Sequence, residues 1–214
     1  MSNEPVAPEV PMPPPEETMP NLTEFETKYR VEPHLLTEFK RIMATIPNLE
    51  KFLYVEGPDE YWVREENFAR YRRPEHGLDN GRAELTMKMK PKGAKNNIIR
   101  REWNWRVDGT PPETIREGLK DLGFVFNFSV WKSCHIYNFD DATLVFYTVY
   151  DTTNGKASKT DSFIEVEVSE EHISGMTEKQ AWEVIEKYEK ILEGVDINPQ
   201  KRMRRSLFEI YVRD

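Results

Sequence analysis

The clearest indication of the fold class is the stretch Glu24-Phe25-Glu26-Thr27-Lys28-Tyr29-Arg30-Val31. Glu, Glu, Lys and Arg occupy every second position of this stretch, and Phe, Thr, Tyr and Val occupy the positions between them. Side chains of a β-strand point alternately to its two faces. The stretch therefore predicts a strand with one fully charged face and one mostly apolar face.

Six further stretches repeat this alternation or are rich in aromatic and β-branched residues, and they predict more strands at 68–73, 84–90, 99–107, 124–137, 143–151 and 162–169. Apolar residues at helical spacing predict three helices, at 35–46, 111–123 and 177–192. The connections between the predicted strands are short, so we expect a mostly antiparallel sheet. We expect Trp103 and Trp105 to be buried between this sheet and a helix.

The charged faces of the predicted strands are sorted by sign. Acidic pairs occur at Glu24, Glu26 and at Glu165, Glu167, and basic pairs occur at Arg70, Arg72 and at Lys88, Lys90. Such faces fit a sheet that curls into a barrel with its charged side chains inside. Arg and Lys would then bind a polyanion such as a phosphate chain, and the acidic pairs would bind Mg²⁺ or Mn²⁺ through oxygen. A solvated sheet face is the alternative interpretation.

The chain has 214 residues, which is enough for one domain with a sizeable core. Its formal charge of −8, from 30 Lys+Arg against 38 Asp+Glu, disfavours general binding to nucleic acid or to anionic membranes. No apolar run approaches the roughly 20 residues that span a bilayer, and no secretory signal pattern is present. The single cysteine, Cys134, suits a reducing compartment, so we expect a cytoplasmic protein.

Residues 1–20, the N-terminal tail, contain four glutamates, seven prolines and no Lys or Arg. Proline removes backbone donors, and the few apolar residues cannot form a core, so we expect a disordered, polyproline-like tail ahead of a folded domain at 21–214. Proline-rich segments also dock into aromatic grooves, so binding of a partner through this tail is an alternative role.

Four motifs, in this order along the chain, resemble the CYTH superfamily, also called the triphosphate tunnel metalloenzymes: Glu24-x-Glu26-x-Lys28, Arg70-x-Arg72, Leu85-Thr86-Met87-Lys88 and Phe163-Ile164-Glu165-Val166-Glu167. The likeness extends from residue 22 to residue 212. It implies an α+β fold, in which an eight-stranded antiparallel β-barrel forms a tunnel and helices pack on its outside. The superfamily includes class IV adenylate cyclases, thiamine triphosphatases and inorganic triphosphatases.

The resemblance also implies the chemistry, in which basic side chains hold a small-molecule triphosphate in the tunnel beside one or two divalent ions, Mg²⁺ or Mn²⁺. The implied metal ligands are Glu24, Glu26, Glu165 and Glu167. The implied phosphate-binding residues are Lys28, Arg70, Arg72, Lys88, Arg100, Lys132 and, in a segment that resembles the family's basic-Ser-Tyr motif, Arg205. The implied catalytic residues are Glu26, Lys28, Asp151 and Glu167.

Three positions depart from the family's pattern, with Asn104 in place of a carboxylate, Cys134 in place of an arginine and Leu207 in place of a tyrosine. The missing arginine contact would be lost or supplied by a neighbour such as His135. We expect a metal-dependent hydrolase of inorganic, nucleoside or thiamine triphosphate. The alternatives are a class IV-like adenylate cyclase, a triphosphatase acting on a 5′-triphosphate RNA end, and a non-catalytic module that binds polyphosphate or nucleotide.

Overall fold

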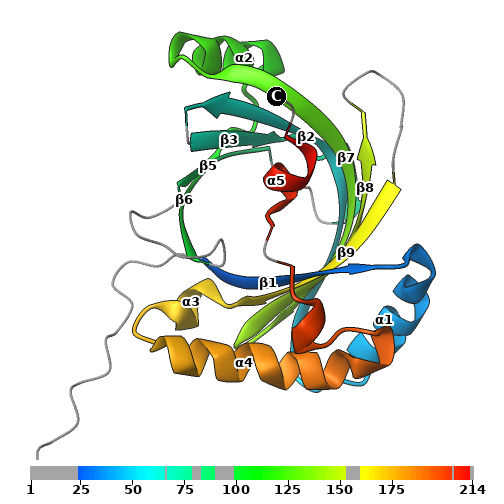
Figure 1. The fold of residues 1–214 in the computed structure, drawn as a ribbon. Coiled ribbons are helices and arrows are strands. Elements are labelled where there is room, and N and C mark those ends of the chain that lie inside the picture. The colour runs from blue at the N-terminus through cyan, green and yellow to red at the C-terminus, as the bar shows by residue number, and fades with distance from the viewer. Residues whose placement is uncertain are drawn as a thin grey trace, which may run out of the picture.

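A computed structural model describes residues 24–65, 67–78, 83–89, 99–152, 160–203 and 205–212. In these residues nine strands form one antiparallel sheet (Figure 1): β1 (Glu24–Val31), β2 (Leu49–Arg64), β3 (Asn67–Arg72), β4 (His76–Leu78), β5 (Glu84–Met89), β6 (Ile99–Arg106), β7 (Val125–Phe139), β8 (Ala142–Asp151) and β9 (Thr160–Val168). The helices are α1 (Leu36–Met43), α2 (Pro112–Asp121), α3 (Glu170–Ile173), α4 (Glu178–Ile191) and α5 (Leu207–Tyr211), with 3-10 turns at Pro33–Leu35, Leu192–Val195 and Pro199–Lys201. None of these described helices is long and apolar enough to cross a membrane.

The strand order is β3-β5-β6-β1-β9-β8-β7-β2-β4, and β2, the next-to-last strand of this order, also pairs with β3, the first. The sheet therefore curves around an interior, visible as the open centre of the ribbon in Figure 1. This confirms the predicted α+β fold with an antiparallel sheet. Full closure into an eight-stranded barrel is not confirmed, because β4 adds a ninth strand and β1 contacts β6 through only two described residue pairs.

Helices cover the convex face of the sheet in two places. Helices α1 and α4 bury the apolar face of β1, β8 and β9, and side chains such as Phe39, Ile185 and Phe146 form the largest core there. Helix α2 places Leu119 against Trp62 and Ala69 in a smaller core. The N-terminus of α4 has the predicted capping box, in which the Thr177 hydroxyl accepts from the Gln180 backbone and the Gln180 side chain accepts from the Thr177 backbone.

Helix α5 departs from the predicted arrangement because it packs on the concave side of the sheet (Figure 1). Leu207 and Tyr211 join Tyr61 and Phe128 in an apolar cluster inside the curve of the sheet. Ser206 begins the helix with a second capping box, formed with Glu209. The expectation that helices pack only outside is therefore wrong for this segment.

Strand β2 is the longest in the structure, with 16 residues, and the sequence pattern did not predict it. Its centre contains Gly57 and Pro58, two residues that ordinarily argue against a strand interior. Pro58 is tolerated because it lies between the part of β2 that pairs with β4, Tyr54–Glu56, and the part that pairs with β3, Asp59–Arg64.

The prediction that Trp103 and Trp105 are buried under a helix is wrong. They are 40% and 45% exposed on the outer face of β6. The prediction was wrong because α2 packs against Met87 and Leu85 of the neighbouring strand and does not bury β6.

Gly57 provides a test of the close approach between β2 and the chain that follows β3. A Cβ at this position would overlap the carbonyl oxygen of Arg73 and would lie 2.9 Å from the Cα of Pro74. Because backbone atoms cannot give way as a side chain can, we expect Gly57→Ala to lower the free energy of unfolding by about 1–3 kcal/mol. Gly118→Ala in α2 is the matched control, since a Cβ there meets nothing within 4 Å. Urea denaturation that gives equal stabilities for both variants would contradict this packing.

Candidate functional site

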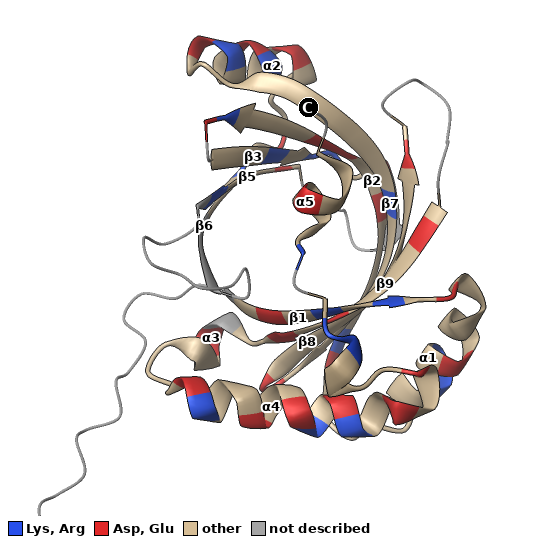
Figure 2. Cartoon of the chain, in the orientation of Figure 1, with Lys and Arg blue, Asp and Glu red and all other residues tan. Residues whose placement is uncertain are grey.

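A cavity of about 220 Å³ lies inside the curved sheet. We call it the charged cavity, because eight of its lining residues are ionisable Lys, Arg or Glu: Glu26, Lys28, Arg70, Arg72, Lys88, Lys132, Glu165 and Glu167. Figure 2 shows Lys, Arg, Asp and Glu on the strands around the interior as well as along α4. The charged faces predicted for separate strands thus meet around one cavity.

The pairing register of the strands brings these residues together. Across β1 and β9, Glu26 lies opposite Glu167, and Lys28 lies opposite Glu165. The register between β3 and β5 likewise brings polar side chains together. Arg70 lies opposite Thr86, and Arg72 lies opposite Glu84. Since side chains alternate, each of these pairs faces the interior while Phe25, Tyr29 and Ile164 pack under α1 and α4.

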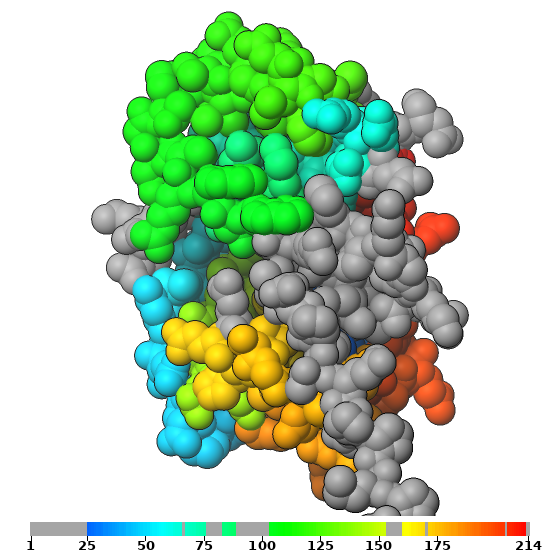
Figure 3. Space-filling view, turned by 90° about the vertical axis from the view of Figure 1, so that its left-hand side faces the viewer, coloured from blue at the N-terminus to red at the C-terminus, as the bar shows by residue number. Residues whose placement is uncertain are grey.

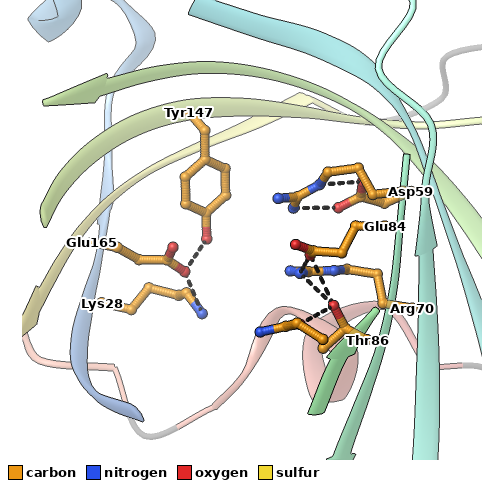
Figure 4. Close-up of polar contacts among 9 residues, drawn as sticks. Lys28, Asp59, Arg70, Glu84, Thr86, Tyr147 and Glu165 are labelled. Atoms are coloured by element: carbon orange, nitrogen blue, oxygen red, sulfur yellow. Dashed lines mark hydrogen bonds and ion pairs between the residues drawn. The ribbon is translucent and has the colours of Figure 1, made fainter. Parts of the chain in front are cut away.

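On one side of the cavity, Lys28, Glu165 and Tyr147 form a buried group (Figure 4). The Lys28 Nζ atom lies 2.7 Å from Oε1 of Glu165, and the Tyr147 hydroxyl donates to the same oxygen at 2.8 Å. Burial alone would raise the pKa of Glu165, but the ammonium groups of Lys28 and Lys132 hold it well below its usual range. Glu165 is therefore a carboxylate with one oxygen already engaged.

On the opposite side, partly buried arginines pair with two carboxylates that the sequence pattern did not identify (Figure 4). Asp59, 1% exposed, accepts two hydrogen bonds of 2.8 Å from Arg72. The Arg70 guanidinium donates to Glu84 at 2.8 Å and to Thr86 at 3.0 Å, and its Nε atom is buried without a partner. An unsatisfied buried donor is costly, so this nitrogen is a place where an anionic ligand would be bound favourably.

Lys132 is the most unusual cation of the cavity. It is 7% exposed, and its Nζ atom lies 3.9 Å from the centre of the Tyr147 ring. Within the described part of the chain, no carboxylate lies within ion-pairing distance of this ammonium group. Burial accordingly lowers the pKa of Lys132. A buried ammonium group without a carboxylate partner favours an anion in the adjoining cavity.

The predicted metal site is only partly described. In the described ranges no three His, Cys, Asp or Glu side chains converge as a metal-binding group, and the side chain of Glu24 falls outside them. Glu26 and Glu167 lie directly opposite each other, however, and like charges so placed destabilise a sheet unless a cation compensates. Lys28 partly does so, 3.6 Å from Glu26. The carboxylate oxygens of Glu26 and Glu167 are the type of ligand atom that a hard divalent ion prefers.

Other predicted residues lie away from the cavity or cannot be placed. Arg205 is exposed, and Asp151 ends β8 opposite Val130; neither lines the cavity. The side chain of Arg100 lies outside the described residues. Lys132, which resembles a family phosphate position, does line the cavity.

The three departures from the family pattern can also be located. Cys134 and Leu207 line the cavity, and Asn104 contacts the Thr86 hydroxyl at 2.7 Å. Burial raises the pKa of the Cys134 thiol, which disfavours a thiolate nucleophile. His135 does not replace the missing arginine, because it stacks on Phe52 instead of lining the cavity.

The Asp59–Arg72 pair has a consequence for stability at acid pH. Burial raises the pKa of Asp59, but Arg72 outweighs that effect and holds the pKa at about 2, below its ordinary 3.8. A lowered pKa stabilises the fold above the ordinary value, and this contribution is lost as pH falls from about 4 to about 2. We therefore expect Asp59→Asn to cost about 3–5 kcal/mol at pH 7, where it leaves Arg72 unpaired, and clearly less near pH 2.

This comparison uses urea denaturation of both proteins at each pH, because carboxylates common to both then cancel in the difference. Glu117→Gln in α2 is the matched control, since Glu117 is exposed and the same acid-to-amide change there should cost little at either pH. A difference between Asp59→Asn and wild type that stays constant from pH 7 to pH 2 would rule out the paired carboxylate.

Comparison with known proteins gives similarity of structure only. No protein-family model matches the chain, and no curated protein matches its sequence. Among solved structures, a conserved protein from Pyrococcus furiosus has a TM-score of 0.64 and 21% identity, over 87% of this chain and 98% of that one. A Vibrio parahaemolyticus protein provisionally assigned as an adenylate cyclase has a TM-score of 0.59 and 17% identity, over 89% and 98%.

A chain of the Schizosaccharomyces pombe Mediator head module is also similar, with a TM-score of 0.52 and 12% identity over 80% of this chain and 94% of that one. Identities this low show a shared fold alone.

Proposed function

We propose that this protein binds a triphosphate in the charged cavity and hydrolyses it with the help of a divalent metal ion. The observation that carries the proposal is the set of five cations around one cavity, Lys28, Arg70, Arg72, Lys88 and Lys132. Lys132 is the most informative member, because it is buried and has no ion-pair partner among the described residues.

The electrostatics favour a ligand with several negative charges close together. Carboxylates hold several of these cations, since Lys28 pairs with Glu165, Arg70 with Glu84 and Arg72 with Asp59. These carboxylates fix the arginine side chains in place before a ligand binds. A ligand bound in such a preorganised, desolvated site gains more from each contact than it would in water. The forked guanidinium groups suit phosphate oxygens in particular.

The carboxylates of the cavity divide into two kinds. Glu165 is engaged by Lys28 and Tyr147, and it serves mainly to hold Lys28. Glu26 and Glu167, opposite each other on β1 and β9, are the residues that would hold a metal ion, and Glu24 lies two residues before Glu26 in the sequence. When bound, a divalent ion would polarise the phosphoanhydride group. Asp151 and Arg205 do not line the cavity, so we leave them out of the proposed site.

In the proposed reaction a water oxygen forms a bond to the terminal phosphorus and the bond from that phosphorus to the bridging oxygen breaks. Phosphate and diphosphate leave, and the water gives up a proton. We assign to Glu26 and Glu167, which line the cavity, the roles of orienting the water and accepting that proton, and to Lys132, Arg70 and Arg72 the stabilisation of negative charge on the phosphate oxygens.

The proposal predicts that Lys132→Gln will remove most of the activity. Purified protein with Mg²⁺ or Mn²⁺ would be offered tripolyphosphate, ATP, thiamine triphosphate and 5′-triphosphorylated RNA, and phosphate release measured. We expect the variant to lower kcat/KM by about 100-fold or more, because one charge-assisted contact to the transition state is lost. Lys120→Gln is the matched control, since Lys120 is exposed on α2, away from the cavity, and should retain wild-type activity.

The same assay separates the alternatives. Formation of pyrophosphate with cyclic AMP from ATP would assign a cyclase instead of a hydrolase. If no substrate is turned over but tripolyphosphate raises the melting temperature of wild type and not of Lys132→Gln, the cavity is a binding site without catalysis. If tripolyphosphate neither reacts nor stabilises the protein, the proposed function is wrong.

A further inference from the structure

Two tryptophans on the outer face of β6 lie uncovered by the described part of the chain. Trp103 is 40% exposed and Trp105 is 45% exposed. Their neighbours across β5 are Met87 and Leu85, which pack partly under α2. Figure 3 views the molecule from the side on which β6 lies in Figure 1, and it shows the green segment that contains β6 and α2 at the surface. A pair of exposed indole rings on one strand face is an apolar surface that calls for a ligand or partner.

The pairing of β1 with β6 relates the start of β1 to the position of these tryptophans. Strands β1 and β6 are antiparallel, with Phe25 opposite Ile99 and Glu24 opposite Arg100. Moving back along the chain from Glu24 therefore corresponds to moving forward along β6, from Arg100 toward Trp103 and Trp105.

The sequence of that segment suits an aromatic surface. Residues 11–20 read Pro-Met-Pro-Pro-Pro-Glu-Glu-Thr-Met-Pro. Proline-rich chains bind exposed aromatic rings because their extended conformation loses little entropy on binding.

We propose that residues 11–20 dock across Trp103 and Trp105 of the same molecule. The length of the tail permits it, because Trp105 lies about 17 Å along β6 from Arg100, and the nine residue-to-residue steps from Pro15 to Glu24 span up to about 28 Å in a polyproline conformation. Attachment beside the site gives the tail a high effective concentration there, which favours it over a second molecule. This inference does not depend on the proposed triphosphate chemistry.

The test is paramagnetic broadening of the tryptophan indole NMR signals in the full chain. A spin label would be attached to Val10→Cys, in a Cys134→Ser background so that one thiol remains. We expect the indole signals of Trp103 and Trp105 to broaden several-fold more than that of Trp182. Trp182 is the matched reference, because its ring lies 5.1 Å from that of Phe25, close to the root of the tail. A tail that moves freely about its root would broaden Trp182 as well.

Two controls decide the outcome. Replacing Pro13, Pro14 and Pro15 by Gly in the labelled chain should abolish the selective broadening, so that the indole signal of Trp182 broadens as much as those of Trp103 and Trp105. Mixing labelled protein with isotope-enriched, unlabelled protein should give no broadening if the tail docks on its own molecule. Equal broadening of all three indoles would overturn the docking, and selective broadening in the mixed sample would overturn docking within one molecule in favour of a second copy.

Discussion

Lys28 and Glu165 face each other across β1 and β9, and their 2.7 Å contact illustrates the constraint on which the whole interior depends. A charge taken out of water must be paired or hydrogen-bonded, or its desolvation destabilises the fold. A slip of one residue in this register would turn Lys28 toward α4 and Phe25 into the interior. The ion pair and the apolar core under α4 therefore select the same register, and the charged cavity follows from it.

Helix α5 is the second element that shapes the cavity. Phe208 stacks on Phe68 with ring centres 4.4 Å apart, and Tyr211 donates to Asp161 at 2.5 Å, so the C-terminal segment is anchored to the concave face at both ends. It fills part of the interior with aromatic side chains and leaves the charged cavity beside them. Contact with this apolar cluster lowers the polarity around the cations and strengthens each electrostatic contact that they make.

Much of this arrangement was predictable from local pattern. The alternation in Glu24–Val31 determined the face of β1, and the matching pairs at Arg70, Arg72 and Glu165, Glu167 identified residues that do line one cavity. The sequence could not identify the side chains that pair with these charged residues. Asp59 lies in β2, a strand that the sequence pattern did not predict because it contains Gly57 and Pro58. The sequence does not distinguish Tyr147 from other core aromatic residues, and only the structure shows that its hydroxyl donates to Glu165.

Tyr147 also shows why the interior behaves as a unit instead of as separate contacts. Its ring faces the ammonium group of Lys132, and its hydroxyl binds the carboxylate that holds Lys28. Burial and the neighbouring Glu165 raise the pKa of Tyr147 well above its usual value, so the hydroxyl keeps its proton and remains a donor. One neutral side chain thus orients an anion and contacts a cation without adding charge. Because Lys28 and Lys132 both depend on it, substitutions at these three positions should not have additive effects on stability.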